Sequence, residues 1–241
     1  MDLEPFECKF YSHNGEDGIT IKLIDLIYTD GYGFNKFYVE FDVQNGIKCN
    51  TRILRKLLNW NGLQLDRVNE SLTIDLQRET ITQENSIEIF QKYNVPTNIN
   101  LLSVNIKFND FYCLKEILKN YVCDIIICDY NASHLPNEDK IIIYDRNGGW
   151  DGCSNYFGAS LLSLKKLTEL HNYSLIYCES QGIKCFFLRN DIINDKQLCF
   201  KNFGDIENIY KKSRCGQSKN GSYGDDIHNR KYITFEEAIN L

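Results

Sequence analysis

The sequence predicts an α/β protein with a mostly parallel central sheet, helices on both faces of the sheet and a C-terminal antiparallel hairpin. Three observations lead to this fold class. Short runs rich in β-branched and aromatic residues alternate with runs that have apolar residues at helical spacing. A strand, a turn and a helix follow one another closely within residues 37–58. Two apolar runs within residues 173–188 flank a short polar turn, which is typical of a hairpin.

The unit at residues 37–58 is the one around which we expect the sheet to be built. Residues 37–43 form a short, mostly apolar run that Asn45-Gly46 closes, so we expect a buried strand that ends in a tight turn. Asn50 is a good N-cap for the helix that follows. Ligands of parallel α/β sheets bind beyond the carboxyl ends of the strands, so residues 40–46 are the first candidate ligand site. The apolar face of the helix is predicted to consist of Ile53, Leu54, Leu57 and Leu58.

Other elements of the first half of the chain flank this unit. Apolar residues at helical spacing predict a short amphipathic helix over residues 19–27, and residues 29–33 are typical of a turn. Residues 62–66 have the pattern of a second strand, with Asp66 at its tip. Residues 83–93 are predicted to be helical, and the Val-Pro pair that follows ends this helix.

The second half continues the alternation. Residues 100–106 and 124–130 are predicted as the third and fourth strands, with a helix between them that Asn109 or Asp110 caps. A short strand at residues 141–144 precedes a long Gly- and Asn-rich loop. The loop leads to a strong helix with one apolar stripe, formed by Leu161, Leu164, Leu167 and Leu170.

The end of the chain is expected to be an extension of the main domain. The hairpin pairs residues 173–178 with residues 183–188, and residues 232–241 are predicted to form a final short helix. We therefore expect an α/β domain over residues 1–200, and an extension over residues 201–241 that packs on the domain or trails from it.

Composition and charge exclude several classes of function. The 241 residues have a net charge of −6 and a pI near 5.3, which argues against a general partner of nucleic acids or anionic membranes. We find no long apolar run and no basic, apolar leader at the start, so we expect no transmembrane helix and no signal peptide. The ten cysteines are scattered without a CxxC pair, which favours reduced thiols in a cytoplasmic compartment.

Four segments carry a recognisable pattern. They are Ser12-His13-Asn14-Gly15-Glu16-Asp17-Gly18, then Val39-Glu40-Phe41 with Gly46 and Cys49-Asn50-Thr51-Arg52, then Leu101-Leu102-Ser103-Val104 with Asn109-Asp110, and finally Trp150-Asp151-Gly152 with Tyr156-Phe157-Gly158-Ala159-Ser160-Leu161-Leu162. In order and spacing they resemble the FkbM-like family of S-adenosylmethionine-dependent methyltransferases. The resemblance implies a Rossmann-like methyltransferase fold, S-adenosylmethionine as cofactor, and O-methylation of a small molecule or of a sugar or glycan.

Two departures from the family pattern affect the cofactor and any metal. The first strand of the family ends in Glu-Phe-Gly, and Asp42 takes the place of this Gly. The third-strand motif of close relatives, Asp-Ile-Asp-Gly-Asn-Asp, is Asn105-Ile106-Lys107-Phe108-Asn109-Asp110 here, so two acids and a Gly are lost. Divalent cations need several oxygen ligands, so we expect no metal site beside Asn105 and Lys107.

The resemblance and the strand ends together indicate the residues that hold the cofactor. Asp66 is expected to bind the ribose hydroxyls, because an acid at a strand tip suits a bidentate contact. Glu40 is expected to contact the cofactor directly or through water, unless it only forms an ion pair at the strand end. Asp42 either points away from the cofactor's carboxylate or pairs with its ammonium group. The predicted cofactor-binding residues are Glu40, Asp42, Asn45, Gly46, Asp66 and Asn105.

The candidate general bases are Asp129, Lys107 and His13, in this order of preference. Lys107 replaces a metal's charge or acts as a base with a lowered pKa, or it is a chance substitution in an inactive site. His13 either assists as a base in a loop at the mouth of the site or has a structural role. The residues predicted to face the substrate are Asn131, Trp150, Asp151 and Tyr156, although Trp150 would also serve to pack its loop.

Two functions are compatible with these observations. One is a methyltransferase that transfers a methyl group from S-adenosylmethionine to an oxygen or nitrogen of a small molecule. The other is a degenerate methyltransferase fold that no longer catalyses a reaction and binds a nucleotide, a glycan or a protein, because the fold by itself does not imply the activity.

Overall fold

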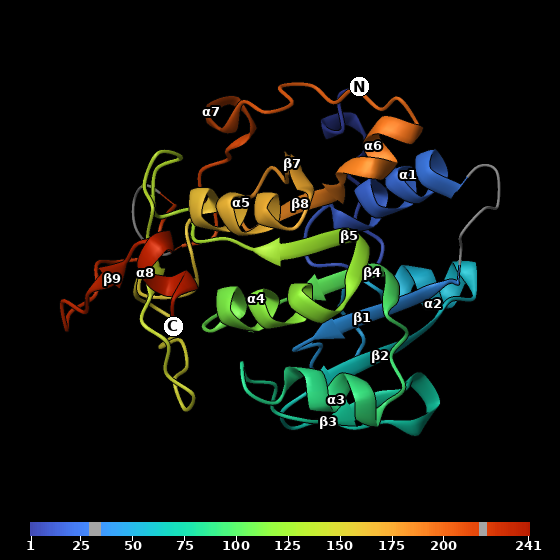
Figure 1. Cartoon of the computed structure of the whole chain (residues 1–241), viewed down its shortest axis with the longest axis horizontal. Coiled ribbons are helices and arrows are strands. Elements are labelled where there is room, and N and C mark those ends of the chain that lie inside the picture. The colour runs from blue at the N-terminus through green and yellow to red at the C-terminus, as the bar shows by residue number, and fades with distance from the viewer. Residues whose placement is uncertain (29–34, 217–220) are drawn as a thin grey trace.

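A seven-stranded sheet forms the centre of the computed structural model, which describes residues 1–28, 35–216 and 221–241. The turn expected at residues 29–33 lies outside the described residues. The strand order is β3-β2-β1-β4-β5-β8-β7; the first five strands are parallel, and β8 runs antiparallel to both its neighbours (Figure 1). The strands are β1 (Phe37–Phe41), β2 (Asn61–Asp66), β3 (Leu76–Arg78), β4 (Asn98–Val104), β5 (Val122–Asp129), β7 (Tyr173–Cys178) and β8 (Lys184–Arg189).

This topology confirms the predicted fold class. The order of the parallel strands is that of a Rossmann-like sheet, and the C-terminal hairpin adds the antiparallel pair. The four strands that the sequence predicts as neighbours pair in the order β2-β1-β4-β5. A separate two-stranded sheet pairs β6 (Ile141–Ile142) with β9 (Tyr232–Ile233).

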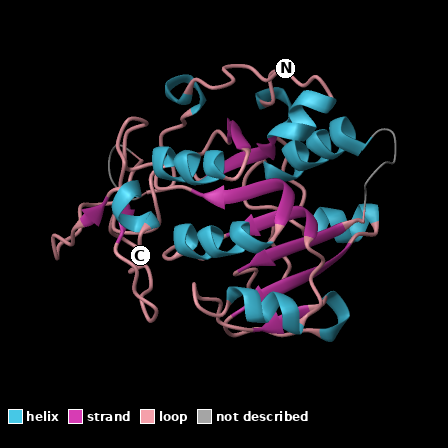
Figure 2. Ribbon diagram, in the orientation of Figure 1, coloured by secondary structure: helices cyan, strands magenta, loops and turns pink. Residues whose placement is uncertain are grey.

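Helices cover both faces of the sheet (Figure 2). One face packs against α3, α4, α5, α7 and α8, and the other against α1, α2 and α6. The strands are apolar on both sides for this reason: in β5, Ile126 and Cys128 enter the first core, while Ile125 and Ile127 enter the second. The helices are α1 (Glu16–Tyr28), α2 (Arg52–Leu58), α3 (Ser86–Lys92), α4 (Asp110–Asn120), α5 (Leu161–Leu170), α6 (Asn190–Asp195), α7 (Ile206–Ile209) and α8 (Phe235–Ile239), with short 3₁₀ turns η1 (Glu4–Phe6) and η2 (Leu72–Ile74).

Some local predictions are wrong. Thr51, not Asn50, is the N-cap of α2, because Glu40 accepts the backbone N–H groups of both residues and fixes where the helix begins. Leu57 in α2 and Leu170 in α5 are 59% and 64% exposed, since each helix buries only a narrow stripe against the sheet. The predicted helix over residues 232–241 begins only at Phe235, and its first part forms β9.

The C-terminal segment, residues 221–241, lies at the end of the sheet where a ligand is expected. In Figure 1, α8 and β9 lie beside the end to which the arrowheads of β1, β4 and β5 point. Phe235 and Ala238 of α8 belong to the larger core. The division between residues 1–200 and 201–241 stays a prediction. In the parts of the chain that the structure describes, no helix has the length and apolar character needed to cross a membrane.

Candidate functional site

Three cavities open at the carboxyl ends of the parallel strands. The β2 cavity measures about 410 Å³ and includes Asp42, Asp66, Arg67, Lys107, Arg146 and Trp150. The central cavity measures about 310 Å³ and includes His13, Glu40, Asp42, Asn105, Lys107, Asp129 and Lys184. The aromatic cavity measures about 90 Å³ and includes Lys107, Asp129, Ser133, Trp150, Phe157 and Tyr223.

Lys107 lines all three cavities, so they converge beyond the ends of β1 and β4. The strand order reverses between β1 and β4, and this reversal is where Rossmann-like sheets bind their ligands. The structure thus brings together all three candidate bases with Glu40, Asp42 and Asn105 around the central cavity. Asp66 and Trp150 join them at the β2 cavity.

Glu40 anchors the connection between β1 and α2. Its fully buried carboxylate accepts hydrogen bonds from the backbone N–H groups of Asn50 and Thr51, each at 2.9 Å, and from Thr51 Oγ1 at 2.7 Å. Asn105 Nδ2 donates to the same carboxylate at 3.1 Å, which ties β1 to the end of β4. A negative charge at the start of a helix is favourable. Glu40 therefore shapes the wall of the central cavity, and its oxygens are already engaged by the protein.

Asp42 and Lys107 follow neighbouring strands and both have left-handed backbones, with φ of 53° and 65°. This conformation is one that Gly adopts without a steric penalty and that costs energy for other residues. Burial raises the pKa of Asp42, and the nearby charge of Asp66 raises it further. Asp42 and Lys107 are two of eleven non-Gly residues with positive φ among the described residues, and these two line both the β2 cavity and the central cavity.

Asp66 is held rigidly at the tip of β2. Its Oδ1 accepts hydrogen bonds from the backbone N–H groups of Val68 and Asn69 at 2.9 Å, and its Oδ2 accepts from Gln44 N–H at 2.8 Å. Burial alone would raise the pKa of Asp66, but the hydrogen bonds from Asn69, Val68 and Gln44 hold the pKa below its usual range. Oδ1 also accepts from Asn69 Nδ2 at 2.9 Å, so Oδ2 is the oxygen with capacity left for a ligand hydroxyl at the edge of the β2 cavity.

Lys184 is the most important residue that sequence reasoning missed. It lies opposite Asp129 in the antiparallel register of β5 and β8, forms an ion pair with Asp129 and donates to Asn105 Oδ1. Burial alone would lower the pKa of Lys184, but Asp129, Glu16 and Glu40 together raise it above its usual range. In the sequence, Lys184 stands out only as a charged residue at the start of a buried strand. Its position beside Asp129 follows from the register of β5 and β8, which the sequence does not reveal.

The three candidate bases differ in their surroundings. Asp129 is fixed by Lys184. Lys107 Nζ lies 6.0 Å from the ring centre of Trp150 and forms no ion pair among the described residues. Partial burial lowers the pKa of His13, although Glu16 opposes this effect, so the imidazole is neutral at pH 7 and able to accept a proton.

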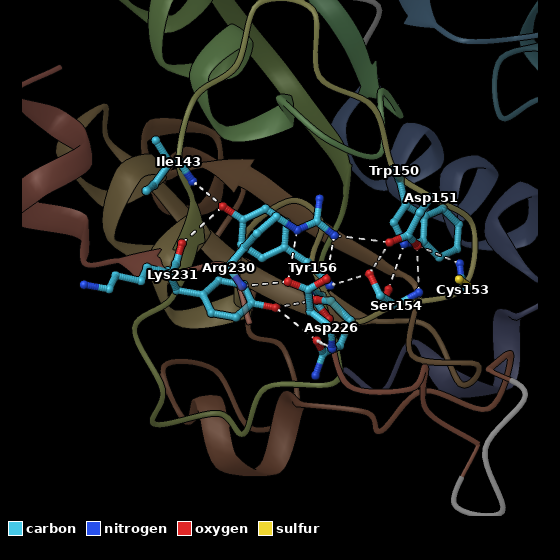
Figure 3. Close-up of polar contacts among 12 residues, drawn as sticks. Ile143, Trp150, Asp151, Cys153, Ser154, Tyr156, Asp226, Arg230 and Lys231 are labelled. Atoms are coloured by element: carbon cyan, nitrogen blue, oxygen red, sulfur yellow. Dashed lines mark hydrogen bonds and ion pairs between the residues drawn. The ribbon is translucent and has the colours of Figure 1, made fainter. Parts of the chain in front are cut away.

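The loop before α5, residues 143–160, contains three residues that were predicted to face the substrate. Only Trp150 lines a cavity, and Asp151 and Tyr156 stabilise the loop. Trp150 lines two cavities, and its Nε1 donates to Ser154 O at 2.8 Å. Asp151 accepts hydrogen bonds within this loop and from Arg230 of the C-terminal segment (Figure 3). Tyr156 is buried, and the guanidinium group of Arg230 lies over its ring. The Tyr156 hydroxyl donates to Lys231 O.

Three other predicted residues do not reach the cavities. Asn131 Nδ2 donates to the backbone carbonyls of Asn155 and Phe157, so it supports the loop from beneath. Asn45 is exposed at the turn after β1. Gly46 has φ of 69°, and an added Cβ would come within 2.5 Å of Ile74 Cδ1. The absence of a side chain at Gly46 therefore allows η2 to pack closely against this turn.

The buried polar groups do not favour a divalent cation in the central cavity. The ammonium of Lys184 already contacts Asp129 and Asn105, the oxygen ligands that a cation would need. Among the described residues, no three His, Cys, Asp or Glu side chains are grouped closely enough to hold a metal ion.

The sequence matches no known family model and no curated protein. Solved structures with a similar arrangement include an O-methyltransferase, NcsB1, from neocarzinostatin biosynthesis, in complex with S-adenosyl-L-homocysteine and 1,4-dihydroxy-2-naphthoic acid. It has 10% sequence identity and a TM-score of 0.34, and the match covers 73% of this chain and 57% of that chain. The pyocyanin biosynthetic protein PhzM has 11% identity and a TM-score of 0.34, with 71% and 56% covered. This chain thus spans a little over half the length of either protein.

Proposed function

We propose that this protein is an S-adenosylmethionine-dependent methyltransferase that acts on a hydroxyl or amino group of a small molecule. The observation that carries the proposal is the convergence of the three cavities at Lys107, beyond the ends of β1 and β4. The β2 cavity offers Asp66 to a ribose, the central cavity offers Asp42 to the methionine ammonium group, and the aromatic cavity offers room for an acceptor.

The buried charges around Lys184 fit a cationic ligand. Glu16, Glu40 and Asp129 are buried around this ammonium, whereas the other two lysines that line the central cavity, Lys48 and Lys107, are exposed, so the buried charge beneath the cavity is negative on balance. S-adenosylmethionine supplies a methyl group on a positively charged sulfonium. Opposite charge within a few ångströms in a partly buried site contributes several kcal/mol to the interaction, on the order of 4 at an intermediate dielectric.

The side chains of the protein have distinct roles in this proposal. Glu40 and Asn105 fix the ends of β1 and β4, so that the cavity keeps its shape. Asp129, oriented by Lys184, is the first candidate to accept the acceptor's proton, followed by Lys107 and His13. Closing the site against water and aligning the acceptor supply most of the remaining rate enhancement.

A second candidate function is binding of an anionic nucleotide without catalysis. Arg67, Arg146 and Lys107 line the β2 cavity, and none of them forms an ion pair with a carboxylate among the described residues. Free cations at the rim of a nucleoside-sized cavity suit phosphate groups, which S-adenosylmethionine lacks.

Calorimetric titration separates the two functions. The methyltransferase proposal predicts one binding site for S-adenosylmethionine with micromolar affinity, and weaker binding of adenosine diphosphate. Tight binding of adenosine diphosphate, with no heat from S-adenosylmethionine at millimolar concentration, would favour the binding module.

A further inference from the structure

The aromatic cavity has walls of three rings that contact one another. The ring centres of Trp150 and Phe157 are 4.9 Å apart, those of Trp150 and Tyr223 are 4.7 Å apart, and those of Phe157 and Tyr223 are 5.5 Å apart. The ring of Tyr223 meets both other rings edge to face, with interplanar angles of 81° to Trp150 and 89° to Phe157. Such a ring cluster offers both faces and edges to another aromatic ring.

Two distant parts of the chain build these walls and are fixed to each other. Trp150 and Phe157 belong to the loop before α5, and Tyr223 belongs to the C-terminal segment. Asn155 N–H donates to Gly224 O at 2.7 Å, directly beside Tyr223. Arg230 adds an ion pair across the two segments, to Asp151 at 3.2 Å, and Asp226 of its own segment holds it in place at 2.8 Å (Figure 3). The C-terminal segment is therefore part of the site.

Polar groups are few in this cavity and lie at defined places. Ala132 and Ile183 complete the apolar lining, together with the ring of Tyr130. Ser133 Oγ is buried and has no hydrogen-bond partner in the described part of the chain. Asp129 and Lys107 line this cavity and the central cavity alike, so they mark the passage between the two.

We propose that the aromatic cavity binds the acceptor and selects a small planar aromatic compound with a hydroxyl group. The ring packs against the wall that Trp150, Phe157 and Tyr223 form together, and the hydroxyl group points through the passage towards Asp129 and Lys107. This inference rests on the proposed methyltransferase function and narrows its acceptor. A sugar fits less well, because the many hydroxyl groups of a sugar would lose their hydrogen bonds to water and find few partners here.

The first test compares three probes by calorimetric titration of the full chain. 4-Nitrophenol represents the aromatic hydroxy compound, cyclohexanol a ring of similar size without aromatic character, and methyl glucoside a sugar. We expect one site for 4-nitrophenol, and binding at least about tenfold weaker for the other two. Tighter binding of methyl glucoside than of 4-nitrophenol would overturn the inference.

The second test removes one wall of the cavity. Tyr223→Leu is expected to weaken 4-nitrophenol binding about tenfold, whereas Tyr223→Phe keeps the ring and most of the affinity. Phe203→Leu is the matched control, because Phe203 is a 45% exposed aromatic residue whose ring contacts Phe200, away from the cavity. Unchanged affinity in Tyr223→Leu would contradict the proposed ring contact.

Titration of S-adenosylmethionine into the same variants tests the acceptor class and the methyltransferase function separately. If S-adenosylmethionine binds and 4-nitrophenol does not, the acceptor class is wrong and the methyltransferase proposal stands. If 4-nitrophenol binds in a Tyr223-dependent manner and S-adenosylmethionine does not bind, the cavity has the inferred specificity and the methyltransferase proposal fails.

Discussion

Removal of the Lys184 ammonium tests the electrostatic core of the site. Lys184→Met keeps an unbranched side chain of similar length and leaves Asp129 as a buried carboxylate without its partner. Breaking a buried ion pair in this way costs about 3–5 kcal/mol. In a domain of this size, 1 kcal/mol shifts Tm by about 2–4 °C, so Tm is expected to fall by about 6–20 °C. Urea and thermal unfolding of the purified variant measure both quantities.

A surface pair provides the matched control. Lys201 pairs with Asp2 at 2.6 Å, but the side chains are 55% and 37% exposed and the pair is screened by water, so Lys201→Met is expected to leave stability almost unchanged. In the double variant Lys184→Met with Asp129→Asn, Asp129 no longer remains as a buried carboxylate without its partner, and the loss should be smaller than the sum of the single losses. Equal losses in Lys184→Met and Lys201→Met would show that the buried ion pair of Lys184 does not stabilise the fold.

The pH dependence of the Lys184 contribution follows from the sign of its pKa shift. The pKa of Lys184 is raised in the folded protein, so its stabilisation is fully present below the unfolded pKa of about 10.4 and is lost only as the pH rises further. The stability loss in Lys184→Met should therefore not become smaller between pH 6 and pH 9, because Lys184 stays protonated in the folded wild type over this range.

Three further substitutions are predicted to have distinct effects. Asp66→Asn should weaken binding of S-adenosylmethionine about tenfold to a hundredfold in calorimetry, because hydrogen bonds to a charged group are worth about 1.5–3 kcal/mol, whereas the exposed neighbour Asp75→Asn should not. Asp42→Gly should relieve the left-handed backbone and raise stability by about 1 kcal/mol, yet weaken cofactor binding; a gain in affinity would show that Asp42 obstructs the site. Asp110 is buried with a pKa raised to about 7 by burial and by Asp129, so its ionisation destabilises the fold as the pH rises from about 4 to about 7. Asp110→Asn should therefore gain more stability in urea unfolding at pH 8 than at pH 5, by on the order of 2 kcal/mol, and an equal gain at both values would contradict the assignment.

The sheet was predictable because its strands are covered on both faces. The buried runs that form β1, β4 and β5 are continuous in apolar residues, and the turns and capping residues between them separate the helices clearly. The edge strand β3 was not assigned, since it has only three residues and gains its order from pairing with β2.

The residues of the site were predictable only where they lie at the ends of strands. Asp66, Asp129 and Asn105 lie at the ends of strands whose order fixes their position, so they line the cavities. Gly46 was expected beside the cofactor, and the structure places it against Ile74 instead. The pairing of Lys184 with Asp129 depends on the register of an antiparallel pair between residues far apart in the chain, which no local pattern specifies.

The same limit applies to the walls of the aromatic cavity. Tyr223 comes from a polar, Gly-rich segment without periodicity, and its place beside Trp150 depends on hydrogen bonds and ion pairs between two loops. Local sequence patterns describe elements that bury apolar surface, and they say little about loops that are held by specific polar contacts.

A crystal structure with S-adenosylhomocysteine would show directly whether the three cavities form a cofactor and acceptor site. We expect the ribose hydroxyls to bind Asp66 in the β2 cavity, the amino acid part to lie in the central cavity beside Asp42, and the sulfur to lie where the cavities converge at Lys107. A product molecule bound elsewhere, or bound with its ribose away from Asp66, would rule out the proposed cofactor site.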